Sequence, residues 1–136
     1  MTIQDLLDNI GDIDSLILTG ICDKNRCAFL VDQLQPTSVE ARGTLIDIGA
    51  NRLDVAYTFC VFGEREAAKG LSDVDVVYIG NHYDAKPAYE LLDAWLPVIK
   101  PGGYLICFDH YADADAELTQ VDENTTDHPP NWYRQA

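Results

Sequence analysis

The chain has 136 residues, of which 47% are hydrophobic and 24% charged, and this composition is typical of one globular domain that can bury a core without disulfides. Its net charge of −14 repels nucleic-acid phosphates and anionic lipids, so we expect no nucleic-acid partner and no membrane partner. No apolar run approaches the ~18 residues of a membrane-spanning helix, and the first residues lack the pattern of a signal peptide. We therefore expect a cytoplasmic protein.

The first predicted element is a short amphipathic helix over residues 1–11. Thr2 can cap its N-terminus, with Asp5 three residues later, and Gly11 can end it. The apolar side chains recur at the i, i+3, i+4, i+7 spacing of one helix face, and they are Ile3, Leu6, Leu7 and Ile10.

Predicted strands and helices alternate over the next hundred residues. A strand at 15–19 is followed by a helix that Asp23 can cap and Pro36 ends, and a polar link leads to a strand at 44–48. Further strands are predicted at 57–62, 74–79 and 104–108, with helices at 64–71 and 85–99 between them. Pro97 is expected to bend the last helix, and Gly102 and Gly103 to form a turn before the last strand.

This alternation predicts an α/β fold, a Rossmann-like, doubly wound and mostly parallel sheet of about five strands. Residues 1–111 form the predicted domain, and residues 112–136 are an acidic, polar tail because they are rich in Asp, Asn, Thr and Pro. Ligands of such sheets bind beyond the carboxyl ends of the strands. Four segments should therefore meet in one crevice, namely residues 20–23, 47–51, 80–83 and 109–111.

The four cysteines are predicted to be reduced, because three of them lie in apolar stretches where a small thiol packs well. The spacing of Cys22 and Cys27 lacks the second matched pair of a structural zinc site, so we expect no zinc. The other two are Cys60 and Cys107.

Residues 74–111 read VDVVYIGNHYDAKPAYELLDAWLPVIKPGGYLICFDHY, and this segment resembles the class I S-adenosylmethionine (SAM) dependent methyltransferases. The order of strand, His-Tyr, amphipathic helix, Lys-Pro-Gly-Gly, strand and Asp-x-Tyr is closest to their small-molecule O-methyltransferase group. The resemblance implies a methyltransferase fold, SAM as cofactor and a small-molecule substrate. Full members of the family have seven strands, whereas about five are predicted for this chain, so the fold is expected to be truncated.

The resemblance can be extended toward the N-terminus in two ways. In the first, the cofactor loop begins with Thr19, Gly20 and Asp23, and Asp47 contacts the ribose hydroxyls. Gly80, after the fourth predicted strand, is a further predicted cofactor-binding residue. In the second, residues 45–51 are the cofactor loop, but 22 residues between Asn51 and Val74 are too few for two further strands and their helices. We prefer the first assignment.

His82, Asp109 and His110 are the predicted catalytic residues, since they follow strands at the binding edge. Imidazole titrates near neutral pH, so either histidine can act as the general base that takes the proton of an acceptor hydroxyl. Tyr83 and Tyr111 would line the acceptor pocket.

Metal-dependent relatives hold Mg²⁺ with an acid after the fourth strand and adjacent acids after the fifth. In this chain the first position is Gly80 or Asn81, and the second is Asp109 followed by His110. We therefore predict no metal site.

Two functions remain open. The first is a SAM-dependent methyltransferase that methylates an oxygen of a small molecule. The second is a catalytically inactive methyltransferase-like domain that binds a ligand or a partner, because Gly20 is the single glycine of the predicted cofactor loop. In either case the apolar strand at 104–108 would be a sheet edge unless the tail or another subunit covers it, so we expect a homo-oligomer through this strand or its flanking helix.

Overall fold

The computed structural model describes residues 2–19, 24–42, 56–58, 67–80, 88–107, 119–120 and 131–136. In chain order its elements are α1 (Ile3–Ile10), β1 (Ser15–Thr19), α2 (Lys24–Leu34), β2 (Ser38–Arg42), β3 (Ala56–Thr58), β4 (Val74–Ile79), α5 (Ala88–Trp95), η1 (Leu96–Val98), β5 (Ile99–Cys107), β6 (Thr119–Gln120) and β7 (Asn131–Arg134). No helix in these ranges is long and apolar enough to cross a membrane.

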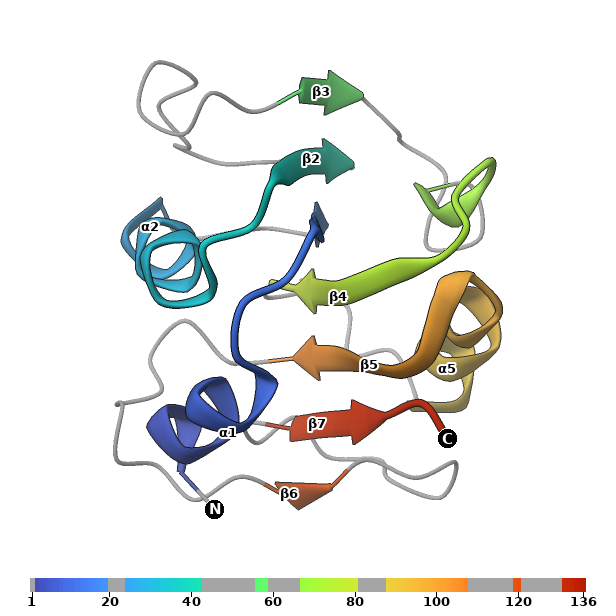
Figure 1. Cartoon of the computed structure of the whole chain (residues 1–136). Helices are drawn as coiled ribbons and strands as arrows, with labels where there is room; N and C mark the ends of the chain where they lie inside the picture. The colour runs from blue at the N-terminus through green and yellow to red at the C-terminus, as the bar shows by residue number, and fades with distance from the viewer. Residues whose placement is uncertain are drawn as a thin grey trace.

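The strands form one seven-stranded sheet in the order β3-β2-β1-β4-β5-β7-β6, which Figure 1 shows from top to bottom. All neighbours from β3 to β5 are parallel, β7 is antiparallel to β5, and β6 is parallel to β7. The predicted Rossmann-like, mostly parallel sheet is confirmed. Its five parallel strands match the prediction of about five strands, and two further strands, β7 and β6, lie within residues 112–136 and extend the sheet beyond β5.

Helices cover both faces of the sheet, with α1 and α2 on one side and α5 on the other (Figure 1). Alternate residues of β4 enter the two cores: Val76 and Tyr78 pack with α1 and α2, whereas Val77 and Ile79 pack with α5. A strand that is covered on both faces needs apolar residues at every position, which explains the nearly continuous apolar run at 74–79.

The N-terminal helix forms as predicted. The Thr2 side chain accepts a hydrogen bond from the Asp5 N–H, the Asp5 carboxylate accepts one from the Thr2 N–H, and Gly11 ends the helix at a φ of 69°. Its inward face buries Ile3, Leu6 and Leu7 against the sheet.

The second strand lies earlier in the chain than predicted. β2 occupies residues 38–42 within the expected polar link and pairs in parallel with β1, from Ser38 opposite Ser15 to Arg42 opposite Thr19. Only Ala41 of β2 is fully buried. Because this strand contributes so little to the core, its hydrophobic pattern is too weak to reveal it. The segment predicted as the strand, residues 44–48, lies outside the described residues, as does 59–62 of the next predicted strand.

The helix before β5 ends at Trp95 rather than at residue 99, because Pro97 lies in the 3-10 turn η1 and Ile99 already belongs to β5. The predicted turn at 100–103 is a bulge inside β5, where the register with β4 shifts between Val74 and Val76. Gly103 is therefore more than a turn residue. A Cβ there would lie 2.7 Å from the Asp75 carbonyl oxygen and 2.6 Å from Ile99 Cγ2, so the backbones approach too closely for any side chain.

β7, which lies within residues 112–136, covers the edge of β5, and this is one of the two kinds of cover that the sequence predicts. Leu105 lies opposite Tyr133 and Ile106 opposite Trp132. Gln135 secures the end of this pairing, since its N–H donates to the Gly103 carbonyl at 2.8 Å and its Nε2 donates to the Leu96 carbonyl at 2.8 Å. Pairing of two subunits through the β5 edge is therefore closed off by the chain itself. A homo-oligomer through the flanking helix stays a prediction.

Candidate functional site

The five parallel strands bring their carboxyl ends to one edge of the sheet, and the last residues of these strands are Thr19, Arg42, Thr58, Ile79 and Cys107. The strand order reverses at β1, which has β2 on one side and β4 on the other. Loops that leave neighbouring strands in opposite directions open a crevice at such a point, and ligands of open α/β sheets bind there. The candidate site is therefore the edge above β1 and β4.

Two of the predicted cofactor-binding residues, Thr19 and Gly80, meet at this point. The Gly80 N–H donates to the Thr19 carbonyl oxygen at 2.8 Å, which continues the β1–β4 ladder by one residue beyond Ile79. Thr19 is 2% exposed and Gly80 is also buried. This hydrogen bond fixes where the two segments that border the crevice leave the sheet.

The other predicted site residues lie outside the described residues, although their strands are described. Gly20 and Asp23 follow β1, Asp47 follows β2, His82 and Tyr83 follow β4, and the last three follow β5: Asp109, His110 and Tyr111. Their roles stay predictions.

Arg42 is a residue of this edge that the sequence analysis missed. Its Nη1 donates to the carbonyl oxygens of Ala67 at 3.1 Å and Lys69 at 2.6 Å, and its Nε pairs with a Glu40 carboxylate oxygen at 3.1 Å. The guanidinium therefore ties the end of β2 to the segment that leads into β4. One alanine between Glu40 and Arg42 is too short an alternation to reveal this strand from the sequence, so no local signal pointed to Arg42.

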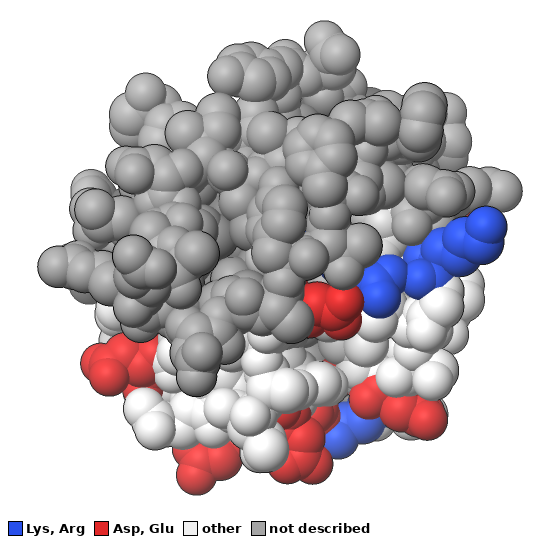
Figure 2. All heavy atoms as spheres, turned by 90° about the horizontal axis from the view of Figure 1, so that it is seen from above, with Lys and Arg blue, Asp and Glu red and all other residues white. Residues whose placement is uncertain are grey.

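The described surface reflects the acidic composition. Figure 2 shows acidic side chains at several separate places, whereas the Lys and Arg side chains gather mainly along one side of the view. The described part of this face therefore carries no broad basic patch of the kind that binds a nucleic acid.

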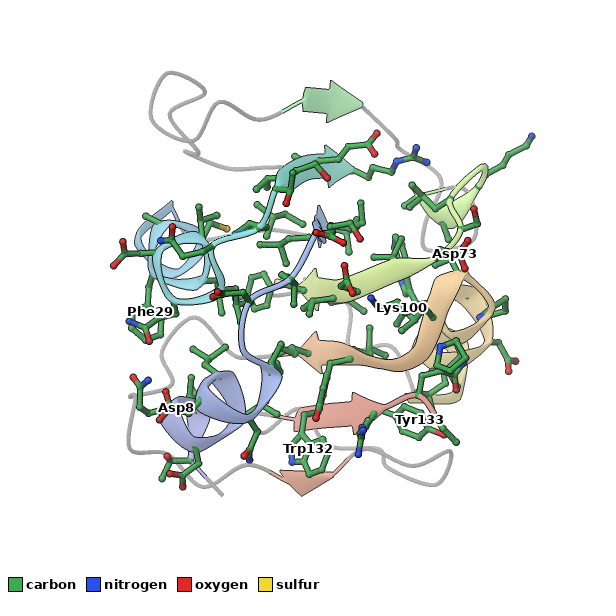
Figure 3. All side chains as sticks on the ribbon, viewed as in Figure 1. Asp8, Phe29, Asp73, Lys100, Trp132 and Tyr133 are labelled. Carbon is green, nitrogen blue, oxygen red and sulfur yellow. The ribbon has the colours of Figure 1, made fainter. Side chains whose placement is uncertain are left out.

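The opposite, amino-terminal edge of the sheet holds a buried carboxylate, Asp75, which is 6% exposed. One of its oxygens accepts hydrogen bonds from the N–H groups of Asp14 at 3.0 Å and Ser15 at 2.9 Å, and from Ser15 Oγ at 3.3 Å. The other oxygen forms an ion pair with Lys100, which reaches from β5 toward β4 in Figure 3. Asp75 thus joins the starts of β1, β4 and β5, and its role is structural.

Burial and hydrogen bonding act on the pKa of Asp75 in opposite directions. Burial raises it, but the hydrogen bonds from Lys100 and from the backbone N–H groups of Ser15 and Asp14 lower it by more, so the pKa lies below its ordinary value. Asp75 is therefore ionised in the folded protein at neutral pH.

Cys27 is a free thiol buried in the core beside α1, and Cys107 lies half-buried at the end of β5. Within the described ranges no three His, Cys, Asp or Glu side chains group closely enough to hold a metal ion. Positions 109 and 110 are not in those ranges.

No protein-family model and no curated protein sequence matches the chain. Solved structures do match. Geranyl diphosphate C-methyltransferase from Streptomyces coelicolor A3(2) superposes with a TM-score of 0.57 at 16% identity, covering 79% of this chain and 42% of that one. Phosphoethanolamine N-methyltransferase 2 from Haemonchus contortus gives 0.55 at 14% identity, covering 77% and 27%.

A third match is a complex between the Trm112 methyltransferase activator and a putative methyltransferase of Haloferax volcanii, with a TM-score of 0.54, 18% identity and coverage of 78% and 50%. The chain thus spans half or less of the length of these solved structures. At such identities the likeness concerns the fold alone. The chain has the fold of the class I SAM-dependent methyltransferases, as the resemblance of residues 74–111 implied.

Proposed function

We propose that this chain is a SAM-dependent methyltransferase domain that methylates an oxygen of a small molecule. The observation that carries the proposal is the strand order β3-β2-β1-β4-β5-β7-β6, which reverses at β1 and has β7 antiparallel to β5. Solved structures with this fold include complexes with S-adenosyl-L-homocysteine and with S-adenosyl-L-methionine. The assignment to the subgroup that methylates oxygen is based on the sequence motifs of residues 74–111.

In this proposal the cofactor lies across the carboxyl edge above β1 and β4. The segment that follows Thr19 would contact its amino-acid part, and the Asp47 carboxylate would accept hydrogen bonds from the ribose hydroxyls. Gly80 has no side chain, so the cofactor can approach the main chain closely there. Bound SAM supplies an electrophilic methyl group on a sulfonium sulfur.

The residues after β4 and β5 would act on the acceptor. His82 or His110 would take the proton of the acceptor hydroxyl, and the acceptor oxygen would receive the methyl group that bound SAM supplies, with S-adenosylhomocysteine as the leaving group. Asp109 would orient the imidazolium, and Tyr83 and Tyr111 would hold the acceptor.

A catalytically inactive, ligand- or partner-binding domain is the second candidate. The single glycine in the predicted loop after β1 favours it, because the sequence has Cys22 and Lys24 where the family usually has further glycines. One of the matched structures is a complex of a methyltransferase with the Trm112 activator, so a partner-binding role has a parallel among proteins of this fold.

Calorimetric titration with SAM and S-adenosylhomocysteine separates the two candidates. We expect both to bind and Asp47→Ala to weaken both by roughly tenfold or more, which is the loss of a hydrogen-bonded charged group. Asp93→Ala removes an exposed carboxylate of α5 and serves as the matched control. If SAM at about 1 mM produced no binding heat and no thermal shift, this result would exclude the methyltransferase and favour the inactive domain.

If the cofactor binds, transfer of a labelled methyl group to phenols, amines and activated carbons tests the acceptor atom. We expect label in the phenol products alone. If only nitrogen or carbon acceptors were labelled, the chain would still be a methyltransferase, but oxygen would be excluded as the acceptor atom.

A further inference from the structure

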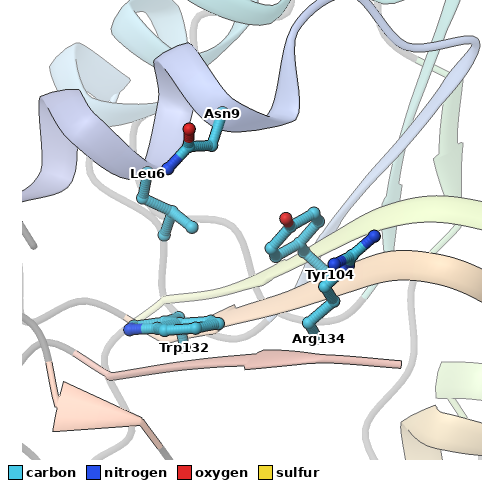
Figure 4. Close-up of a pocket in the computed structure, with 5 residues that line it drawn as sticks. All are labelled: Leu6, Asn9, Tyr104, Trp132 and Arg134. Atoms are coloured by element: carbon cyan, nitrogen blue, oxygen red, sulfur yellow. The ribbon is translucent and has the colours of Figure 1, made fainter. Parts of the chain in front are cut away.

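A groove of about 360 Å³ opens on the face of the sheet that α1 covers, between α1 and the strands β5 and β7 (Figure 4). It is lined by Leu6 and Asn9 of α1, Tyr104 of β5, and Trp132 and Arg134 of β7. This volume lies within the range of small-molecule sites. The groove is distinct from the candidate cofactor site, since it opens on a face of the sheet and Tyr104 lies three residues before the carboxyl end of β5.

Two aromatic side chains form the floor of the groove. The ring centroids of Tyr104 and Trp132 lie 6.3 Å apart, with an angle of 41° between the ring planes. Both side chains are half-buried and pack against the core beneath α1. The core therefore holds each ring in place while part of its surface stays available to a ligand, and such a platform suits a planar, apolar group.

Arg134 provides a positive charge beside this floor. Its guanidinium carbon lies 6.0 Å from the centre of the Tyr104 ring, and no carboxylate within the described ranges forms an ion pair with it. The chain has 23 acidic and nine basic residues, so an arginine placed over an aromatic ring instead of beside a carboxylate stands out.

The spacing of the two β7 residues defines the shape of the ligand. Trp132 and Arg134 are two residues apart on one strand and both line the groove. A strand advances about 3.4 Å per residue, so the two side chains leave the strand roughly 7 Å apart. A ligand that contacts both must carry its ring and its anionic group at a similar separation. Asn9 on the opposite wall offers an amide donor to the same anionic group.

We propose that this groove binds a small aryl-alkanoic acid, with its ring on Trp132 and its carboxylate paired with Arg134. A guanidinium and a carboxylate can form a bidentate pair with two parallel hydrogen bonds, which is a strong charge-assisted contact. The site goes beyond methyl transfer, because nothing in it depends on SAM or on the residues of the carboxyl edge.

The test titrates the ¹⁵N-labelled full-length chain with 3-phenylpropionate and, separately, with 3-phenylpropionamide, which has nearly the same shape without the charge. The chain has two tryptophans, and Trp95 is fully buried, so its indole N–H is an internal control. We expect the Trp132 indole resonance to move with the acid while that of Trp95 stays. The amide should bind about tenfold or more weakly, since it lacks the charge-assisted pair.

Two substitutions that each remove one positive charge complete the experiment. Arg134→Gln should weaken binding of the acid to the level of the amide, whereas Lys69→Gln, at an exposed residue that does not line the groove, should leave it unchanged. Arg134 is itself exposed, so both variants are expected to fold. Equal affinity for acid and amide, an unchanged affinity in Arg134→Gln, or no Trp132 shift up to about 10 mM acid would overturn the proposal.

Discussion

Replacing Asp75 by asparagine removes the charge that joins the starts of three strands while it preserves the size of the side chain. The carboxylate accepts hydrogen bonds from the main chain of Asp14 and Ser15 and pairs with Lys100. Asparagine keeps one carbonyl oxygen for these donors but brings an N–H₂ group in place of the second oxygen. The ion pair is lost, and one oxygen can no longer serve all of the donors.

The expected loss follows from these contacts. Hydrogen bonds to a charged group contribute about 1.5–3 kcal/mol, and asparagine retains part of them, so we expect the free energy of unfolding to fall by about 2 kcal/mol. The Lys100 side chain is 43% exposed, so solvent screens its ion pair, which adds little to this figure. For a chain of this length the melting temperature should fall by roughly 6–10 °C.

The pH dependence gives an independent check, because the pKa of Asp75 is lowered from 3.8 in the folded state. A lowered carboxyl pKa stabilises the fold fully above the unfolded value and less as pH falls through the folded value. The difference in melting temperature between wild type and Asp75→Asn should therefore be constant from about pH 6 to 8 and shrink below about pH 4.

Thermal unfolding followed by circular dichroism across this pH range measures the difference. Asp93→Asn, at an exposed position of α5, is the matched control and should leave the melting temperature nearly unchanged. A loss under about 0.5 kcal/mol at neutral pH, or a difference that widens in acid, would refute the reasoning.

Two further predictions concern β5. Gly103→Ala should lower the free energy of unfolding, measured by urea denaturation, by about 3 kcal/mol, because the new Cβ would lie 2.7 Å from a carbonyl oxygen. Gly70 is the control: it has a φ of 81° and open space around it, so Gly70→Ala should cost about 1 kcal/mol. Equal losses in the two variants would contradict the close approach at Gly103. Removal of residues 131–136 takes away β7 and leaves the β5 edge unpaired, so size-exclusion chromatography should show association that removal of the exposed Ala136 alone does not cause. A truncated chain that elutes at the position of the full chain would contradict it.

Local patterns in the sequence identify α1, β1 and β4 with bounds close to those in the structure. The helix has a capping box at Thr2 and Asp5 and an apolar face with the right period, and the two central strands are short apolar runs. These elements are recognisable because each contributes several side chains to a core. The segment 74–111 likewise reveals the family of folds, since its motifs follow one another in a single stretch of chain.

β2 and β7 lack such a signal. Only Ala41 of β2 is fully buried, and Trp132 and Tyr133 of β7 are half-buried on opposite faces of the sheet. Both strands exist because a distant strand offers unpaired N–H and C=O groups, β1 in one case and β5 in the other. A local hydrophobic pattern does not report hydrogen bonds of that kind.

For the candidate site, the sequence located the edge that the strands share, and the structure brings Thr19 and Gly80 together there. The hydrogen bonds from Arg42 to the main chain of residues 67 and 69, and the groove beneath α1, each join residues from separate parts of the chain, so no single segment of the sequence shows them.

The sequence by itself determined that parallel strands covered on both faces form the centre of the molecule, because burial on both faces demands apolar residues at consecutive positions of β1 and β4. Only the tertiary structure decided which polar segments join the sheet and why Gly103 tolerates no side chain. Strand pairing satisfies main-chain groups, which every residue carries alike, so the choice of partner and register appears only when the chain is folded.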